Sequence, residues 1–213
     1  MQVKYFTIAG GNKTALIWDC PEAERLPKAN ELLATVEQVG FVTDGERPQL
    51  LMMGGELCIN ALIALAAHSG NVEGILATTT HPEILYKNYI NKTSIVIPLT
   101  HTKEDNVILF DGIGFVCVQE GDGPPTHSLS SYAAKYNKPA FGTVTYDSAG
   151  RIVPRIHVVS TDSERDETAC GSGSVAVHLA TGHTHLVQPT GEIIIVHSDG
   201  ETFYIEASVA KLT

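Results

Sequence analysis

Short apolar runs rich in β-branched residues alternate with turn residues along most of the chain, a pattern that predicts strands. Such runs include "VKYFTI", "TALIWD" and "VGFVTD" in the first half, and "FGTVTYD" and "GEIIIVHS" in the second. Four stretches instead predict helices: residues 22–36, residues 128–137, and the segments that follow Cys58 and Cys170. The sequence therefore predicts a mixed α/β (α+β) fold in which strands outnumber helices.

The two cysteine segments are versions of one motif. Residues 54–70 are "GGELCINALIALAAHSG", and residues 166–182 are "DETACGSGSVAVHLATG". When Cys58 is set over Cys170, small and apolar positions coincide and both segments end in glycine. The order strand, strand, helix, strand, strand, cysteine helix also occurs in both halves, so we expect an internal duplication.

The duplication indicates how the chain divides. The stretch "PLTHTKED", at about residues 98–105, interrupts the strands. We therefore expect a first domain over residues 1–100 and a second over residues 101–205. Whether the last strand, about residues 206–213, crosses back to complete the first domain is left open by the sequence.

Neither cysteine helix has a polar face. The stretches "NALIALAAH" and "GSVAVHLA" are apolar all round, which is typical of a buried helix. The simplest arrangement surrounds each central helix with its own curved sheet and gives two pseudo-symmetric half-barrels that face each other. The cleft between them is a natural place for a small-molecule site.

Composition narrows the choice of partners. The chain has 213 residues, of which 43% are hydrophobic and 18% charged, as in ordinary globular proteins. Its formal net charge of -10 argues against a nucleic-acid or anionic membrane partner. No run reaches the roughly 18 apolar residues of a membrane span, and the first residues lack a basic-then-apolar signal pattern. We therefore expect a cytoplasmic protein whose four cysteines are thiols.

Each motif cysteine begins a buried helix, whose N-terminus offers unpaired N–H groups and a partial positive charge. We expect the N–H groups of residues 59–61 and 171–173 to bind a carboxylate. The same field is expected to lower each thiol pKa from about 8.5 to roughly 3.5–7.5. One thiolate would then remove a substrate α-proton while the opposite thiol protonates the other face. The sequence offers no metal-ligand set and no sign of a pyridoxal lysine, so we expect a stereocentre to be inverted without metal or cofactor.

These motifs resemble those of the cofactor-independent amino-acid racemases and epimerases of the diaminopimelate epimerase fold. "GELCINA" is similar to the family's first cysteine motif, E-x-C-G-N-G/A, and "ETACGSG" is similar to its second, E-T-x-A-C-G-T-G. "GGNKTALIWD" (10–19) resembles an N-terminal substrate-binding segment, and "QPTGEIII" (188–195) resembles the late P-G-G-x-L-x-I segment. Within the family, "EQVGF" (37–41) and the pattern E-x-x-C-G-S-G are most similar to the histidine racemases of staphylopine-type metallophore biosynthesis.

The resemblance implies that Cys58 and Cys170 are the two bases that invert the α-carbon of a free amino acid, with histidine as the first candidate. It also implies that Glu37 and Glu167 approach the amino or side-chain end of the substrate. The residues expected to line the substrate site are Asn12, Glu37, Gln38, Ile59, Asn60, Glu167, Gly171, Ser172 and Gly173. The family leaves a homodimer open, and an amino acid is the one small-molecule partner that we expect.

The sequence departs from the family in several respects. Ile59 stands where the family has glycine, and "DGIGF" (111–115) replaces its Gly-Asn-Pro-His segment. The pair Glu164-Arg165 resembles the Glu-Arg pair that holds the distal end of diaminopimelate, but it lies nearer the cysteine. The alternatives are therefore a diaminopimelate epimerase or another amino-acid epimerase, and a catalytically silent protein that binds an amino acid in the same cleft. Retention of both motif cysteines favours the enzyme. Glu56 could simply complement the helix dipole, while Cys20 and Cys117 are expected to be structural.

Overall fold

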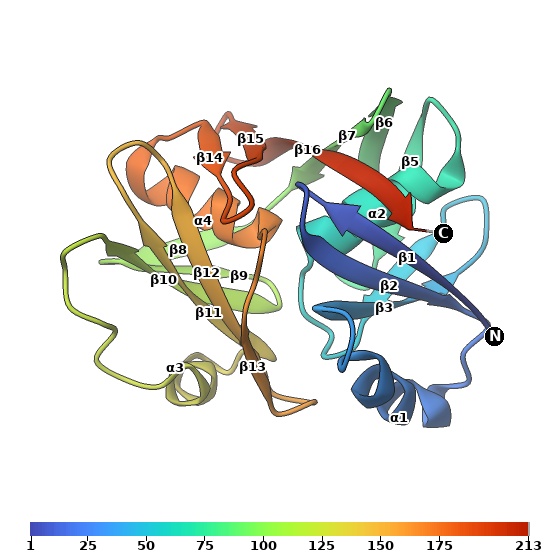
Figure 1. Cartoon of the computed structure of the whole chain (residues 1–213), viewed down its shortest axis with the longest axis horizontal. Coiled ribbons are helices and arrows are strands. Elements are labelled where there is room, and N and C mark those ends of the chain that lie inside the picture. The colour runs from blue at the N-terminus through green and yellow to red at the C-terminus, as the bar shows by residue number, and fades with distance from the viewer. Residues whose placement is uncertain (213) are drawn as a thin grey trace.

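The computed structural model describes residues 1–212, and Figure 1 shows two lobes side by side. Within these residues, the first lobe contains a closed ring of hydrogen-bonded strands. In ring order they are β1 (Gln2–Ile8), β2 (Asn12–Trp18), β3 (Gln38–Thr43), β4 (Gln49–Met52), β5 (Glu73–Thr78), β6 (Ile84–Tyr89), β7 (Lys92–Pro98) and β16 (Thr202–Leu212). The ring closes because β16 pairs with β7 along one edge and with β1 along the other. Thr213, which belongs to the predicted last strand, lies outside the described residues.

Helix α2 (Ile59–Ser69) runs through the middle of this ring and contacts every strand in it. Its first two turns are fully buried, which explains why the segment has no polar face. In β16, burial alternates along the strand, and Phe203, Ile205 and Ala207 face the core. The sequence predicted a half-barrel here. The ring around α2 is closed instead, because β16, from the end of the chain, fills the gap between β7 and β1.

The second lobe contains a sheet in the order β13-β12-β11-β10-β9-β8. Its strands are β8 (His101–Glu104), β9 (Val107–Phe110), β10 (Ile113–Gln119), β11 (Ala140–Tyr146), β12 (Ile152–Val158) and β13 (Ser163–Asp166). Helix α4 (Gly171–Thr181) packs against β9, β10 and β11, and also against β14 (His185–Val187) and β15 (Ile193–Ser198). Because β14 and β15 extend the first sheet beyond β16, that sheet supplies part of the wall around α4. How the lobes correspond to domains stays a prediction.

The four helices expected from the sequence are all present within residues 1–212. Helix α1 (Glu22–Leu32) ends before the predicted residue 36, because the chain turns there to enter β3. Helix α3 (Leu129–Tyr136) begins after Ser128, whose hydroxyl accepts the Ser131 N–H. Helices α1 and α3 occupy equivalent places, since α1 connects the parallel pair β2 and β3, and α3 connects β10 and β11. In the second lobe three strands, not the predicted two, precede each helix, so the duplication is approximate.

The two cysteine helices are equivalent in detail. Cys58 and Cys170 are both N-cap residues in extended conformation, and each is followed by a helix of 11 residues. Both helices end in a left-handed glycine, with φ of 70° at Gly70 and 82° at Gly182. The duplicated motif therefore folds twice into the same local structure.

The N-termini of α2 and α4 pack against each other where the lobes meet. A Cβ atom at Gly171 would lie 2.7 Å from the Ile59 Cβ and 2.5 Å from its Cγ2. Ile59 is completely buried. The Ile59 side chain therefore occupies the space that Gly171 leaves open.

We predict that Gly171→Ala destabilises the fold by about 1–3 kcal/mol, because its methyl group would overlap the Ile59 side chain. Equilibrium urea unfolding measures this change. Gly123→Ala is the matched control, since a Cβ there meets nothing within 4 Å and should change stability by less than about 1 kcal/mol. Equal effects at the two glycines would contradict the close contact between the helices.

Candidate active site

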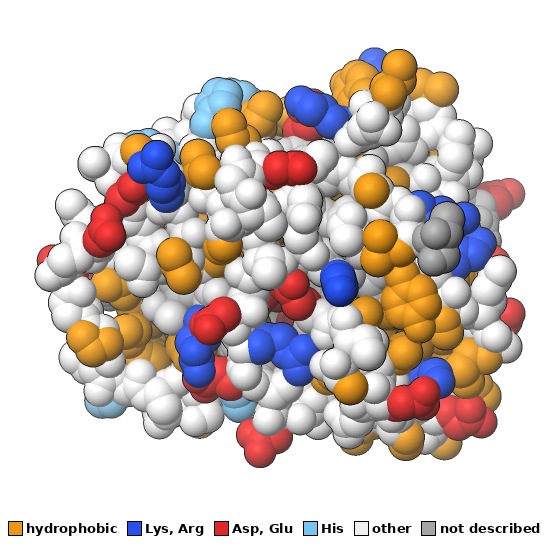
Figure 2. All heavy atoms as spheres, in the orientation of Figure 1, with side chains coloured by type: hydrophobic (Ala, Val, Ile, Leu, Met, Phe, Trp, Pro, Cys, Tyr) orange, Lys and Arg blue, Asp and Glu red, His pale blue; other side chains and the backbone are white. Residues whose placement is uncertain are grey.

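A pocket lies between the two lobes, beside the N-termini of α2 and α4. In Figure 2, charged side chains gather at the centre of the face where the lobes meet. The residues lining the pocket come from both lobes: Glu37, Gln38, Met53, Glu56, Leu57, Cys58, Asn60, Ile113, Ile156, Val158, Ser163, Arg165, Glu167, Cys170, Gly171 and Ser172. About 30 Å³ of it is open to the centres of water-sized molecules, so the pocket is narrow as it stands. We expect its walls to move apart when an amino acid enters.

The N-termini of the two helices are capped by each other's side chains. Asn60, in the first turn of α2, accepts the Gly171 N–H at 3.0 Å and donates to the Ala169 carbonyl at 2.9 Å. Ser172, in the first turn of α4, accepts the Ile59 N–H at 3.4 Å and donates to the Leu57 carbonyl at 3.3 Å. Because the two capping residues occupy equivalent positions of the duplicated motif, the pseudo-symmetry of the sequence extends to the contact between the helices.

Each motif sulfur also caps its own helix. It accepts the N–H three residues further along, at 3.4 Å for Cys58 and 3.2 Å for Cys170. Together with the caps from Asn60 and Ser172, these contacts occupy four of the six N–H groups that were expected to bind a carboxylate. Fewer N–H groups than the sequence predicted are therefore free to bind a carboxylate in the pocket as it stands.

Burial raises the pKa of the Cys58 and Cys170 thiols well above the ordinary value, and the Glu167 carboxyl adds to the shift at both. The expectation that the helix N-termini lower these pKa values is therefore wrong. The N–H contacts do act in that direction, but the loss of water around the sulfurs and the nearby carboxyl outweigh them. At rest near neutral pH both groups are thiols, and a cysteine needs a proton acceptor before it can act as a base.

Two carboxyl groups in the pocket keep their protons to unusually high pH. Burial raises the pKa of Glu56 to about 7 and the pKa of Glu167 to about 8. The Glu167 carboxyl lies near the Cys170 thiol and raises its pKa, whereas Glu56 accepts the Gly54 N–H at 2.8 Å. An ionised Glu167 is therefore placed to take up the Cys170 proton. Glu56 faces the pocket as well, which goes beyond the helix-dipole role considered from the sequence.

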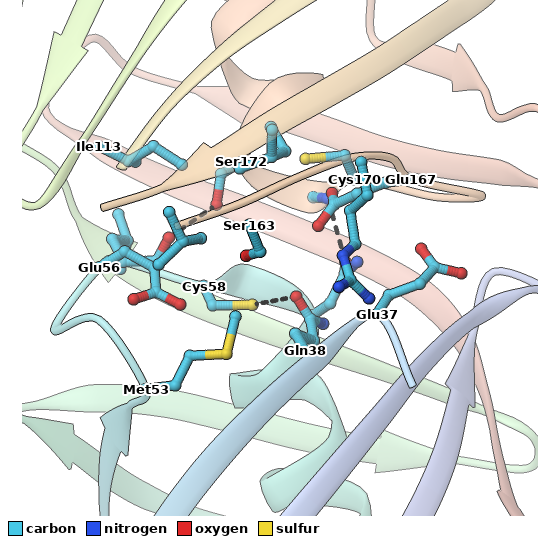
Figure 3. A pocket seen from close by; sticks show the side chains of 16 residues that line it. Glu37, Gln38, Met53, Glu56, Cys58, Ile113, Ser163, Glu167, Cys170 and Ser172 are labelled. Atoms are coloured by element: carbon cyan, nitrogen blue, oxygen red, sulfur yellow. Dashed lines mark hydrogen bonds between the residues drawn. The ribbon is translucent and has the colours of Figure 1, made fainter. Parts of the chain in front are cut away.

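A hydrogen-bond network runs from Cys58 into the first lobe. The thiol donates to Gln38 Oε1 at 2.9 Å, the contact drawn as a dashed line in Figure 3. Gln38 Nε2 donates to Asn12 Oδ1 at 2.7 Å, and Asn12 Nδ2 donates to Glu37 Oε2 at 3.0 Å. Glu37 also accepts the Thr168 N–H and hydroxyl, at 2.9 and 2.6 Å. Since Thr168 belongs to the segment before Cys170, this network joins the two motifs.

The structure brings most of the predicted site residues to the pocket. All but Asn12, Ile59 and Gly173 line it. Asn12 lies one hydrogen bond behind the wall, Ile59 packs against Gly171, and Gly173 lies beneath the Cys170 sulfur. The roles assigned to these residues in substrate binding stay predictions.

The site residues predicted from the sequence did not include Arg165 or the apolar part of the wall. Arg165 Nη1 donates to the carbonyls of Leu33 and Val36 at 3.1 and 2.9 Å, across the junction of the lobes. Its spacing in the sequence could have indicated it. The pocket is lined by Ser163, Arg165 and Glu167, and residues two positions apart lie on the same face of a strand. The apolar wall, which includes Met53 and Ile113, comes from loops and strand ends and carried no such signal.

The described part of the chain offers neither a metal-binding cluster nor a membrane-spanning helix. No group of three or more His, Cys, Asp or Glu side chains within residues 1–212 is arranged to hold a metal ion. No helix in that part of the chain is long and apolar enough to cross a membrane. The cysteines are free thiols, with Cys117 buried in β10 and Cys20 partly exposed at the start of the α1 segment.

No protein-family model matches the sequence, and no curated protein matches it. Solved structures resemble it over 100% of this chain and 98% of theirs. They include a predicted epimerase from Pseudomonas aeruginosa (TM-score 0.66, 13% identity) and PhzF-family phenazine biosynthesis proteins from Enterococcus faecalis (0.61, 13%) and Bacillus anthracis (0.60, 12%). At this identity the likeness shows the fold. These structures share the diaminopimelate epimerase-like fold, so the predicted fold class is confirmed.

We predict that stability falls as the pH rises from 5 to 8.5, because Glu56 and Glu167 hold protons in the folded state that they release when unfolded. This contribution is complete below the unfolded pKa, about 4.5, and is lost as the pH passes 7 and then 8. Glu56→Gln, which stays neutral, should remove roughly 2–3 kcal/mol of the fall.

Urea unfolding at several pH values measures the effect. Glu46→Gln, at an exposed position in the β3–β4 loop, is the control and should keep the wild-type slope. If the Glu56→Gln slope equals that of the control, Glu56 is not a buried proton-holding group.

Proposed function

We propose that the protein is a cofactor-independent isomerase that inverts the α-carbon of an amino acid by transferring protons between two thiols. The single observation that carries this proposal is that Cys58 and Cys170, which are equivalent in the duplicated motif, line one pocket from different segments (Figure 3). A simple binding pocket needs no thiol at both places. Two thiols at a stereocentre can serve as base and acid in turn.

The surrounding groups support each step. In the proposed reaction one cysteine, as a thiolate, removes the α-proton, and the other thiol donates a proton to the opposite face. Glu167, beside Cys170, accepts the thiol proton when it is ionised, and its pKa of about 8 keeps the carboxylate form within reach near working pH. The N–H groups at the two helix ends stabilise the charge that develops on the carboxylate. When the pocket opens around a substrate, these groups exchange their present partners for it.

The charge of the lining favours a neutral or cationic side chain. The described lining contains three carboxyl groups, Glu37, Glu56 and Glu167, and one guanidinium, Arg165. The Arg165 Nη1 is already engaged by two backbone carbonyls. A second carboxylate, as in diaminopimelate, would therefore find only one cationic group in the described lining, and the Nη1 of that group already has two partners. We propose histidine as the first candidate, since its imidazole can donate a hydrogen bond to a carboxyl group.

The structural neighbours agree with an isomerase in a general way. One of them carries the name predicted epimerase, and the others belong to the PhzF family. Their fold places two equivalent helices around a central junction, which suits chemistry at opposite faces of one carbon. The name of a neighbour at 13% identity leaves the substrate of this chain open.

A silent amino-acid-binding protein is the second candidate. The observation in its favour is the raised pKa of both thiols, which opposes formation of a thiolate in the closed pocket. In that protein the motif cysteines would act as helix caps alone. Replacing either sulfur would then leave ligand binding intact, and no enantiomer would ever appear.

We expect one amino acid of a panel to be converted to its enantiomer or epimer without any added cofactor. The panel contains L-histidine, meso-diaminopimelate, L-glutamate and L-aspartate, and chiral chromatography measures the product. Cys58→Ser and Cys170→Ser should each lower the rate by a factor of about 10²–10⁴, because serine is a far weaker acid at these positions. Cys20→Ser, at a cysteine outside the pocket, is the matched control and should keep the wild-type rate. Full activity in both motif variants would contradict the proposed mechanism.

A further inference from the structure

In the hydrogen-bond network behind Cys58, the donor and the acceptor of each bond can be assigned. The assignment starts from a group that can only donate. The Thr168 N–H can only donate, and it donates to Glu37 Oε2. The same oxygen is 3.0 Å from the Asn12 amide, so Asn12 must present its Nδ2 there. The Oδ1 of Asn12 is thereby turned away from Glu37 and toward Gln38 and Thr14.

Gln38 is oriented by the next two contacts. Its amide lies 2.7 Å from Asn12 Oδ1 and 2.7 Å from Thr14 Oγ1. The Thr14 hydroxyl already donates to Asn12 Oδ1, at 3.0 Å, so it offers Gln38 a lone pair. Gln38 therefore points Nε2 at both groups and has Oε1 left for Cys58, 2.9 Å from the sulfur. The side chains of Asn12, Thr14 and Gln38 are all buried, so no bulk water competes for these hydrogen bonds.

An amide oxygen can only accept, so Cys58 has to be the donor in this contact. A thiolate would face the oxygen lone pairs with no hydrogen between them. The surroundings of Cys170 are different, because its thiol lies near Glu167, a carboxyl group that can take up the proton once it is ionised. The two motif cysteines are thus equivalent in backbone but have unlike partners.

We infer that the Gln38 amide holds Cys58 in its protonated form in the resting protein, so that Cys58 is the proton donor of the first turnover. Gln38 is thus a positioning residue. This inference rests on the proposed function for its catalytic meaning, while the protonation state itself can be measured without turnover.

In the first turnover each proton has a defined donor and a defined acceptor. Glu167 first releases its own proton to water and, as a carboxylate, takes the proton of Cys170. The resulting thiolate forms an S–H bond with the substrate α-proton while the C–H electron pair stays on the substrate. The S–H bond of Cys58 breaks, and its proton forms the new C–H bond on the opposite face. Cys58 ends as a thiolate that Gln38 does not stabilise, so it regains a proton before the next turnover in the same direction.

The test is the pH dependence of iodoacetamide alkylation at each cysteine, followed by peptide mass spectrometry in three variants. Asn12→Leu and Thr14→Val each leave one acceptor for the Gln38 Nε2, so either variant alone should keep the wild-type profile of Cys58. The double variant removes both acceptors and frees the amide to turn its N–H toward the sulfur. Its Cys58 should react about tenfold faster at pH 7.5, with the Cys170 profile unchanged.

If only the double variant speeds the alkylation of Cys58, the effects of the two substitutions are strongly non-additive. The orientation of the Gln38 amide is then the cause of the change. Additive effects of the single variants, equal shifts at both cysteines, or an unchanged double variant would each overturn the inference. Thermal melting by circular dichroism checks that the variants fold.

A wild-type measurement keeps the inference testable if the double variant does not fold. Cys58 is more exposed than Cys170, which is 5% exposed, so iodoacetamide can reach it. We expect the alkylation rate of wild-type Cys58 to keep rising above pH 9, and a rate that levels off below pH 9 would contradict its being held as a thiol by Gln38. Because alkylation requires no turnover, this result is independent of the assay for an enantiomer, whose failure would instead remove the proposed function.

Discussion

The contact between the N-termini of α2 and α4 is the constraint on which the rest of the structure depends. Each terminus is buried, and a buried N–H or C=O group without a partner costs about 1–3 kcal/mol. Asn60 and Ser172 meet this need across the junction, each capping the other helix. Separation of the helices would leave both ends without these partners, so the caps hold the lobes together at the point where the thiols lie.

The same contact sets the chemistry of the pocket. It places each sulfur at the start of its helix, on the wall of a narrow pocket. Burial then raises the pKa of the thiols and of Glu56 and Glu167, so protons are held close to the sulfurs near neutral pH. A site of this kind exchanges protons between neighbouring groups and does not rely on a permanently charged thiolate.

Much of the site could be predicted from the sequence, since the signal was local. The duplicated motif located both cysteine helices, their capping glycines and half of the pocket lining. The closure of the first ring could not be predicted in the same way, because β16 pairs with β1 from the far end of the chain. The thiol pKa values were predicted with the wrong sign, because the helix field was known from the sequence whereas burial and the position of Glu167 were not. Ile59 looked like a loss to the substrate site, and it proved to pack against Gly171.

The central claim is that two thiols act on opposite faces of one α-carbon. Its most direct test is the early time course of the reaction in D2O, with the converted amino acid followed by NMR and separated by chirality. Two bases predict that deuterium enters the product enantiomer, delivered by the donor thiol, while the remaining substrate keeps its proton. Deuterium appearing equally fast in recovered substrate and product, or a product that retains the original α-proton, would show that one base does the work and would contradict the account.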